Sequence, residues 1–114
     1  MVQHAFPALL TAVQQGKITL EKLVEKACHN PAILFKIHYR GFLRENYFAD
    51  FVLVDMNQKF KVVKEDLLYQ CGWSPFEGTT FGATIVKTFV NGNLVYDRGK
   101  IIEGKLGKRL TFDR

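Results

Sequence analysis

The side chains best suited to chemistry in this sequence are three histidines, two cysteines, one serine and two carboxylates in turns. They belong to His4, His29, His38, Cys28, Cys71, Ser74, Asp50 and Glu77. A zinc site made from such residues usually contains pairs of ligands that lie close together along the chain. No two histidines have that spacing, and the two cysteines lie too far apart for a metal or redox motif. We therefore predict structural or solvated histidines, and reduced cysteine thiols buried in the core.

Ser74 lies in the most distinctive segment, residues 69–78, where Gly and Pro residues surround the only Trp and the only Ser of the chain. A nucleophilic serine often sits in a Gly-x-Ser-x-Gly turn between a strand and a helix. Here Phe76 takes the place of the second Gly, and Pro75 follows the serine directly. The pattern therefore favours a turn role for Ser74 over a nucleophilic one.

Asp50 and Glu77 could be mistaken for a catalytic pair of carboxylates. Both lie in predicted turns beside strands, where a carboxylate commonly accepts hydrogen bonds from backbone N–H groups. Cys71 has no basic neighbour in the sequence that would activate its thiol. We therefore predict no catalytic, cofactor-binding or metal-binding residue in this chain.

The length of 114 residues and a hydrophobic content of 47% suit one domain with a packed core. No apolar run reaches the roughly 18 residues that span a membrane, and the start of the chain lacks the features of a secretory signal. We expect a cytoplasmic protein without a membrane partner. Basic residues give a net charge of +5 but alternate with acidic ones, so we expect no nucleic-acid partner.

The first third of the chain has the periodicity of helices. Pro7 suits an early helical position, and Gly16 is expected to end that helix. The apolar residues with helical spacing predict a buried face made of Ala8, Leu9, Ala12 and Val13. Thr19 is then a good cap for a second helix. Its apolar face is expected to contain Leu20, Leu23, Val24 and Ala27, and Asn30-Pro31-Ala32 is expected to end it and cap a short helix through Phe35.

From Gly41 onward the sequence has the periodicity of strands. The apolar run Phe51–Val54 predicts a strand buried on both faces. Two further strands, at residues 83–90 and 94–96, flank Asn91-Gly92, a pair that suits a type I′ hairpin turn. The chain thus divides into a helical part, residues 1–38, and a β part, residues 39–114.

Three segments, in this order along the chain, resemble the amidohydrolase superfamily. The first, Asn30–Phe35, resembles the turn after the last helices of that family's barrel. The second, Gly41–Asp55, is similar to the segment by which the chain leaves the barrel and enters a β-sandwich. Its Asn46 replaces the family's usual Gly, and Asn also tolerates a left-handed conformation. The third resembles the family's final turn and hairpin, and consists of Ser74–Gly78 and Val86–Tyr96.

The version of the turn at Cys71–Gly78 is most similar to that of bacterial dihydroorotases, although allantoinases and dihydropyrimidinases share the hairpin. The resemblance implies an α+β chain, in which the last helices of a (β/α)8 barrel precede the C-terminal strands of the β-sandwich. It also implies a zinc amidohydrolase that interconverts N-carbamoyl-L-aspartate and dihydroorotate in pyrimidine biosynthesis.

The family's zinc ligands and catalytic Asp precede the position that matches Met1, so none of them can be assigned to this chain. Val2–His4 would end a loop near the substrate mouth. The resemblance therefore implies that the chain alone holds no zinc and is inactive.

Other interpretations remain open. The parent protein could be a non-catalytic dihydroorotase-like scaffold for a partner such as aspartate carbamoyltransferase, or an allantoinase or dihydropyrimidinase. A basic nucleic-acid-binding module is the weakest alternative. Because a C-terminal fragment would expose apolar surface, we expect this chain to pair with the missing N-terminal part of the parent or to self-associate.

Overall fold

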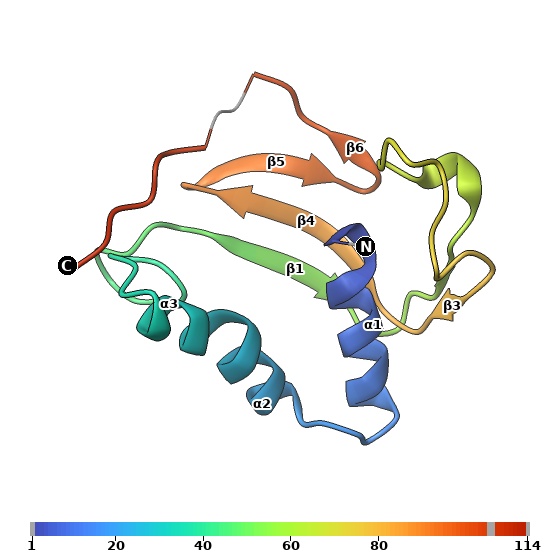
Figure 1. Cartoon of the computed structure of the whole chain (residues 1–114), viewed down its shortest axis with the longest axis horizontal. Coiled ribbons are helices and arrows are strands. Elements are labelled where there is room, and N and C mark those ends of the chain that lie inside the picture. Colours follow the sequence, from blue (N-terminus) through green and yellow to red (C-terminus); the bar gives the residue numbers. More distant parts are fainter. Residues whose placement is uncertain (1, 105–106, 114) are drawn as a thin grey trace. The chain divides into compact units, whose positions relative to one another are not determined.

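Two stretches that are far apart in the sequence build each of the two units of this computed structural model (Figure 1). Unit 1 consists of Met1–Leu20 and Asp55–Thr84, and unit 2 consists of Glu21–Val54 and Ile85–Arg114. The structure describes residues 2–104 and 107–113. The predicted boundary between residues 38 and 39 refers to a larger barrel and sandwich, and it stays a prediction.

Unit 1 contains one long helix and a small antiparallel sheet. The helix α1 spans Val2–Gln14 and ends just before Gly16, whose φ of +70° confirms the predicted stop. The remaining elements are β2 (Phe60–Lys61), the 3-10 turn η2 (Lys64–Asp66) and β3 (Thr80–Phe81), with β2 paired to β3. The core of this unit contains the buried residues Leu10, Val62, Phe81 and Ala83.

The buried face of α1 differs from the predicted one. His4, Pro7 and Leu10 are buried, whereas Leu9 is 41% exposed. Polar side chains of the helix bind backbone groups of the unit: Gln14 Nε2 donates to Gly82 O at 3.0 Å, and Gly82 N–H donates to Thr11 Oγ1 at 3.1 Å. The apolar pattern missed this face because part of it is held by hydrogen bonds from polar side chains. Since α1 already begins at residue 2, the expected loop at Val2–His4 is also wrong.

A second helical segment runs without a break from residue 20 to residue 34. It consists of α2 (Leu20–Val24), a π-helical turn η1 (Glu25–His29) and α3 (Asn30–Leu34). The start after Thr19 is confirmed, but the predicted end at Asn30 is wrong, because its backbone N–H donates to Glu25 O and closes the wider π turn. Pro31 follows where a missing N–H is tolerated. Of the expected apolar face, Leu23 is buried, whereas Leu20 and Ala27 are exposed.

The larger sheet belongs mainly to unit 2 and has the strand order β1-β4-β5-β6. Its strands are β1 (Phe51–Asp55), β4 (Thr84–Val90), β5 (Asn93–Asp97) and β6 (Lys100–Ile101). The antiparallel pair β4–β5 is joined through Asn91 and Gly92, with φ values of +52° and +77°. Positive φ at both positions confirms the predicted hairpin turn.

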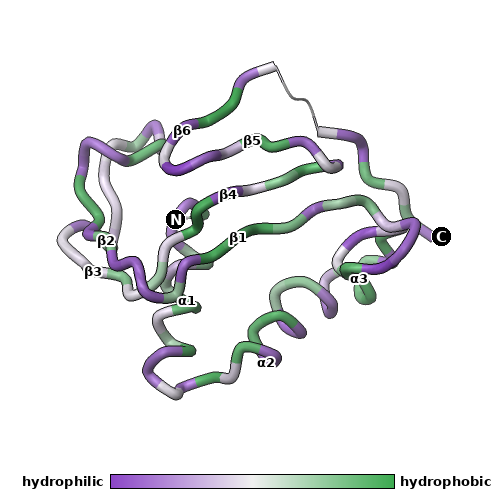
Figure 2. Tube along the Cα trace, turned by 180° about the vertical axis from the view of Figure 1, so that it is seen from behind, coloured by the Kyte–Doolittle hydropathy of each residue, from purple (hydrophilic) through white to green (hydrophobic). Residues whose placement is uncertain are grey.

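Strand β1 is not buried on both faces, as the sequence predicted. Its apolar residues form a continuous hydrophobic stretch of chain (Figure 2), yet Val52 is 38% and Leu53 46% exposed. Phe51 stacks on Phe89 of the neighbouring strand, with ring centroids 4.5 Å apart. Among the described residues β1 is an edge strand, so only one of its sides is paired. Strand β1 therefore has apolar side chains that the described structure leaves exposed.

No helix in the described part of the chain is long and apolar enough to cross a membrane.

Gly41 allows a close approach between the loop after α3 and the helical segment. Its φ is +81°, and a Cβ atom there would lie 2.5 Å from Ala32 Cβ and 2.8 Å from Cys28 O. We expect Gly41→Ala to lower the free energy of unfolding by about 2 to 4 kcal/mol, because left-handed strain and overpacking add. Urea unfolding measures the loss.

The matched control for this substitution is Gly99→Ala. Gly99 has a similar φ of +88°, but nothing lies within 4 Å of a Cβ placed there. We expect this variant to lose only about 1 kcal/mol, the cost of left-handed strain. Equal losses in both variants would show that the contact with the helical segment has no effect.

Candidate functional site

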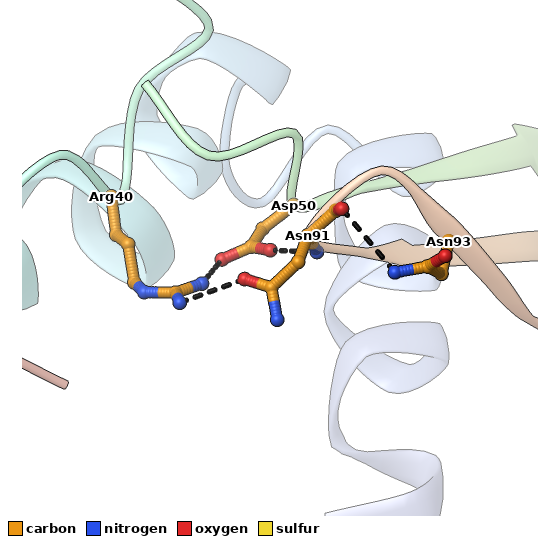
Figure 3. Close-up of polar contacts among 4 residues, drawn as sticks. All are labelled: Arg40, Asp50, Asn91 and Asn93. Atoms are coloured by element: carbon orange, nitrogen blue, oxygen red, sulfur yellow. Dashed lines mark hydrogen bonds and ion pairs between the residues drawn. The ribbon is translucent and has the colours of Figure 1, made fainter. Parts of the chain in front are cut away.

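Buried and half-buried polar side chains form two clusters, one in each unit. In unit 2, Arg40 pairs through Nη1 with Asp50 Oδ2 and donates through Nη2 to Asn91 Oδ1 at 2.8 Å (Figure 3). The backbone N–H of Asn91 donates to Asp50 Oδ1 at 2.7 Å and closes the triangle. We call these three residues the Arg40 cluster.

Three separate segments of the chain position the Arg40 cluster. Arg40 belongs to the loop after α3, Asp50 directly precedes β1, and Asn91 begins the turn between β4 and β5. A backbone hydrogen bond from Gly92 N–H to Ala49 O, at 2.9 Å, runs beside it. The cluster therefore joins the loop, the start of β1 and the hairpin.

The electrostatics of the Arg40 cluster are those of a closed ion pair. The side chain of Arg40 is 11% exposed, and its guanidinium group lies 4.1 Å from the centre of the Phe48 ring. Both oxygens of Asp50 accept hydrogen bonds, which agrees with the predicted role of binding backbone N–H groups. A carboxylate occupied in this way is not available as a general base.

In unit 1, His4 is 4% exposed and its Nδ1 lies 2.7 Å from the hydroxyl of Tyr69. The rings of Phe60, Phe76 and Phe81 surround it, with centroids 6.1 to 6.5 Å away. We call His4, Tyr69 and these three rings the His4 cluster. Burial lowers the pKa of His4 from its ordinary value of 6.5, and the positive N-terminus lowers it further.

Gln3 holds the same loop beside the His4 cluster. Its Nε2 donates to Asp66 O at 2.8 Å, and the backbone N–H of Leu68 donates to its Oε1 at 2.9 Å. The first turn of α1 is therefore bound to residues 66–69 through two neighbouring side chains. In this arrangement His4 is a structural residue, as predicted.

The three histidines have different surroundings. His4 belongs to unit 1, whereas His29 and His38 belong to unit 2. His29 stacks on Phe42 with centroids 4.3 Å apart, and the backbone N–H of His38 donates to Thr111 O at 2.9 Å. Within the described residues no group of three or more His, Cys, Asp or Glu could hold a metal ion.

The segment around Ser74 is a turn. Ser74 is buried and its Oγ accepts a hydrogen bond from the backbone N–H of Phe76 at 3.1 Å, so the predicted turn role is confirmed. Glu77 is exposed in the same turn. The prediction of buried cysteines is wrong, because Cys28 and Cys71 are both free and exposed. Cys71 lies in this irregular segment, where its thiol donates to Trp73 O at 3.5 Å.

Sequence reasoning missed Arg40 and Asn91 as partners of Asp50. It also missed Gln3 and Gln14 as side chains that bind backbone groups of unit 1. The available signal was weak: Asp50 and Asn91 each flank a predicted strand. A long side chain such as that of Arg40 can reach several partners, and its spacing in the sequence does not indicate which one it binds.

Comparison with known proteins agrees with this architecture. Residues 1–95 match the model of the "Amidohydrolase family", and the chain therefore belongs to that family. The similarity to dihydroorotases inferred from the three sequence segments is also confirmed. A dihydroorotase of Pyrococcus furiosus is 36% identical over 105 residues, which are 92% of this chain and 25% of that protein.

Other relatives act on related compounds, by their names. An allantoinase of Desulfitobacterium hafniense is 35% identical over 109 residues, 95% of this chain and 24% of that protein. Among solved structures, an L-hydantoinase (dihydropyrimidinase) from Arthrobacter aurescens is 33% identical with a TM-score of 0.77. That likeness covers 84% of this chain and 22% of the hydantoinase. The chain spans about a quarter of the length of these relatives.

The comparisons and the structure together establish an α+β chain of the amidohydrolase family, with antiparallel strands. The assignment of its helices to a barrel and of its strands to a sandwich stays a prediction.

We expect Asp50→Asn to destabilise the chain by about 2 to 3 kcal/mol, because it leaves the nearly buried charge of Arg40 without its partner. Urea unfolding followed by circular dichroism measures the loss. Glu45→Gln, which removes a carboxylate from an exposed position nearby in the sequence, should change stability by less than about 0.5 kcal/mol. A loss as small for Asp50→Asn would mean that the Arg40 cluster contributes nothing.

Acid should weaken unit 1 through His4. Because burial lowers its pKa, the unfolded chain binds more protons than the folded chain between the two pKa values. The contribution of neutral His4 to the free energy of unfolding is therefore complete above pH 6.5. It is lost as the pH falls from 6.5 toward the lowered pKa of His4. In this pH window, the free energy of unfolding of the His4→Gln variant should depend much less on pH than that of the unchanged chain.

Tyr69→Phe provides the comparison for the His4 substitution. It removes the hydroxyl that lies 2.7 Å from His4 Nδ1 but keeps the aromatic ring. We expect the Tyr69→Phe variant to lose about 1 kcal/mol of unfolding free energy at pH 8. Its unfolding free energy should still decrease as the pH falls, as in the unchanged chain. An unchanged slope in His4→Gln would assign the acid sensitivity to another group.

Proposed function

We propose that this chain forms the C-terminal quarter of a dihydroorotase-like enzyme, which interconverts N-carbamoyl-L-aspartate and dihydroorotate. The observation that supports it most directly is the match to the Pyrococcus furiosus dihydroorotase, which covers nearly all of this chain and a quarter of that protein. In this proposal the zinc ions are held by the rest of the polypeptide. They would polarise the scissile carbonyl and lower the pKa of water.

The role proposed for the chain itself is structural. Two of its half-buried or buried polar groups bind other groups of the chain: Asp50 binds Arg40 and a backbone N–H, and His4 binds Tyr69. Such groups stabilise loops and leave the reaction to residues elsewhere.

A second candidate is an allantoinase-like activity. The allantoinase of Desulfitobacterium hafniense is nearly as similar as the dihydroorotase and matches slightly more of the chain, 95% against 92%. The hydantoinase likeness points in the same direction, toward cyclic amides in general. The choice between these substrates is therefore a matter for direct assay.

A non-catalytic scaffold with an aspartate carbamoyltransferase partner is a further proposal. A relative of Dictyostelium discoideum shows that a similar region occurs within a longer polypeptide: its "Multifunctional protein pyr1-3" is 35% identical over 104 residues, and these are 4% of that protein. The matching region there is a small part of a long polypeptide. A scaffold of this kind would not restore activity in the assay below.

The test combines this chain with the Pyrococcus furiosus dihydroorotase from which the matching quarter has been removed. We expect the chain alone to bind no zinc tightly and to hydrolyse nothing. The mixture should hydrolyse dihydroorotate at least tenfold faster than the truncated enzyme, because the chain completes its fold. The measurements are zinc content by atomic emission and hydrolysis of dihydroorotate, allantoin and dihydrouracil.

The positive control is the truncated enzyme mixed with its own C-terminal quarter. Preference for allantoin in the test mixture would favour the second candidate. Turnover or tightly bound zinc in the chain alone, or no rescue where the control is rescued, would contradict the proposal.

A further inference from the structure

The turn between β4 and β5 contains an asparagine in a chemically reactive setting. Asn91 precedes Gly92, whereas the other asparagines of the chain precede Pro, Tyr, Gln or Leu. In an Asn-Gly pair the backbone nitrogen of Gly can attack the side-chain Cγ of Asn without an enzyme, because no Cβ of the second residue hinders the approach. The hairpin turn therefore has the groups needed for a chemical modification.

The modification is a deamidation, and its atoms balance with water as the only co-reactant. Gly92 N loses its proton and forms a bond to Asn91 Cγ, while the bond from Cγ to Nδ2 breaks. Nδ2 takes up a proton and leaves as ammonia, so that a succinimide ring remains. Water then opens one of the two C–N bonds of the ring and leaves Asp or isoaspartate at residue 91. Nothing is oxidised or reduced.

In the folded chain, hydrogen bonds occupy the backbone groups that this reaction needs. Gly92 N–H donates to Ala49 O at 2.9 Å. The attack removes the Gly92 proton, and therefore it must break this bond. Both oxygens of Asp50 already accept hydrogen bonds, one of them from Asn91 N–H, so this carboxylate is not free to take the proton.

The side chain of Asn91 is also held. Its Oδ1 accepts a hydrogen bond from Arg40 Nη2 at 2.8 Å, which fixes the direction of the amide (Figure 3). Nδ2, the atom that would leave, is buried and has no hydrogen-bond partner among the described residues, so no group there supplies its proton. Arg40 also draws electron density from Cγ, which favours attack, but this effect matters only once Gly92 N has reached Cγ.

We propose that Asn91-Gly92 is a site of spontaneous deamidation, which the Arg40 cluster keeps closed in the folded chain. The reaction then proceeds through molecules in which the cluster has opened, either locally or by unfolding of the whole unit. The same two residues thus form the hairpin turn in the folded chain and react in the opened one. This inference concerns unit 2 alone and is independent of the reaction that the parent enzyme catalyses.

Deamidation would damage the hairpin irreversibly. A carboxylate at residue 91 would share the guanidinium group of Arg40 with Asp50, and two carboxylates at one site repel each other. Isoaspartate would in addition lengthen the backbone of the turn. The pairing of β4 with β5 would then shift, because the length of the turn sets the register of a hairpin.

The test follows residue 91 in mildly alkaline buffer, with and without urea, by peptide mapping and mass spectrometry. This measurement separates the Asn, Asp and isoaspartate forms. We expect the folded chain to react at least about tenfold more slowly than the unfolded chain, because it reacts only through its opened fraction. Arg40→Met removes the hold on Asn91 Oδ1 and should accelerate deamidation of the folded chain by about threefold or more.

Two controls separate the cluster from general effects. Gly92→Ala adds a Cβ that hinders the attack, and it should slow deamidation in urea, where the fold has no influence. Gly41→Ala destabilises the same unit without removing a member of the cluster. Its deamidation should rise only in proportion to its unfolded fraction, which urea unfolding measures, whereas Arg40→Met should exceed that proportion.

Three outcomes would overturn the proposal. The unchanged chain could deamidate as fast without urea as with it, and the fold would then give no protection. Residue 91 could fail to react even in urea. Arg40→Met could follow only its unfolded fraction, as Gly41→Ala does, and the cluster would then have no part in the protection. Circular dichroism checks that each variant folds, and Asp50→Asn replaces Arg40→Met if that variant does not.

Discussion

The nearly buried charge of Arg40 is the constraint on which unit 2 depends most. A guanidinium group that is 11% exposed must find partners for its donors, since an unpaired buried charge costs several kcal/mol. Asp50 and Asn91 supply them, and each lies at the end of a strand. The ion pair therefore fixes where β1 starts and where the β4–β5 hairpin turns, because the partners of Arg40 must meet at one point. The ion pair therefore both stabilises unit 2 and determines the positions of these strand ends.

In unit 1, neutral side chains supply hydrogen-bond partners for polar groups of the loops. Its helix α1 faces backbone N–H and C=O groups of segments that have little regular structure, and Gln3, Thr11 and Gln14 satisfy them. His4 lies in an aromatic cluster, and its burial disfavours the charged form and lowers its pKa. Both units thus use polar side chains to bind loops.

What the sequence could predict here was the local geometry. The stop at Gly16, the start after Thr19, the Asn91-Gly92 turn and the turn at Ser74 each depend on a few adjacent residues, and all four are present. The errors concern how segments pack against one another: the buried face of α1, the burial of β1 and the exposure of both cysteines. Packing partners come from distant parts of the chain, and the pattern of one segment does not identify them. The Arg40 cluster was missed for the same reason.

The mismatch between sequence and structure at β1 has a physical interpretation. An apolar run without a charge from Phe51 to Val54 is typical of a strand covered on both faces, yet Val52 and Leu53 are exposed. In the described residues β1 also has a neighbouring strand on one edge only. Natural edge strands usually contain charges or Pro that prevent pairing, and this run contains neither. The sequence of β1 thus suits an interior strand. Together with a match to a quarter of each relative's length, this favours a further strand beside β1 over an exposed edge. Whether that strand comes from an amidohydrolase polypeptide or from a second copy depends on affinity, and an unprotected edge accepts either.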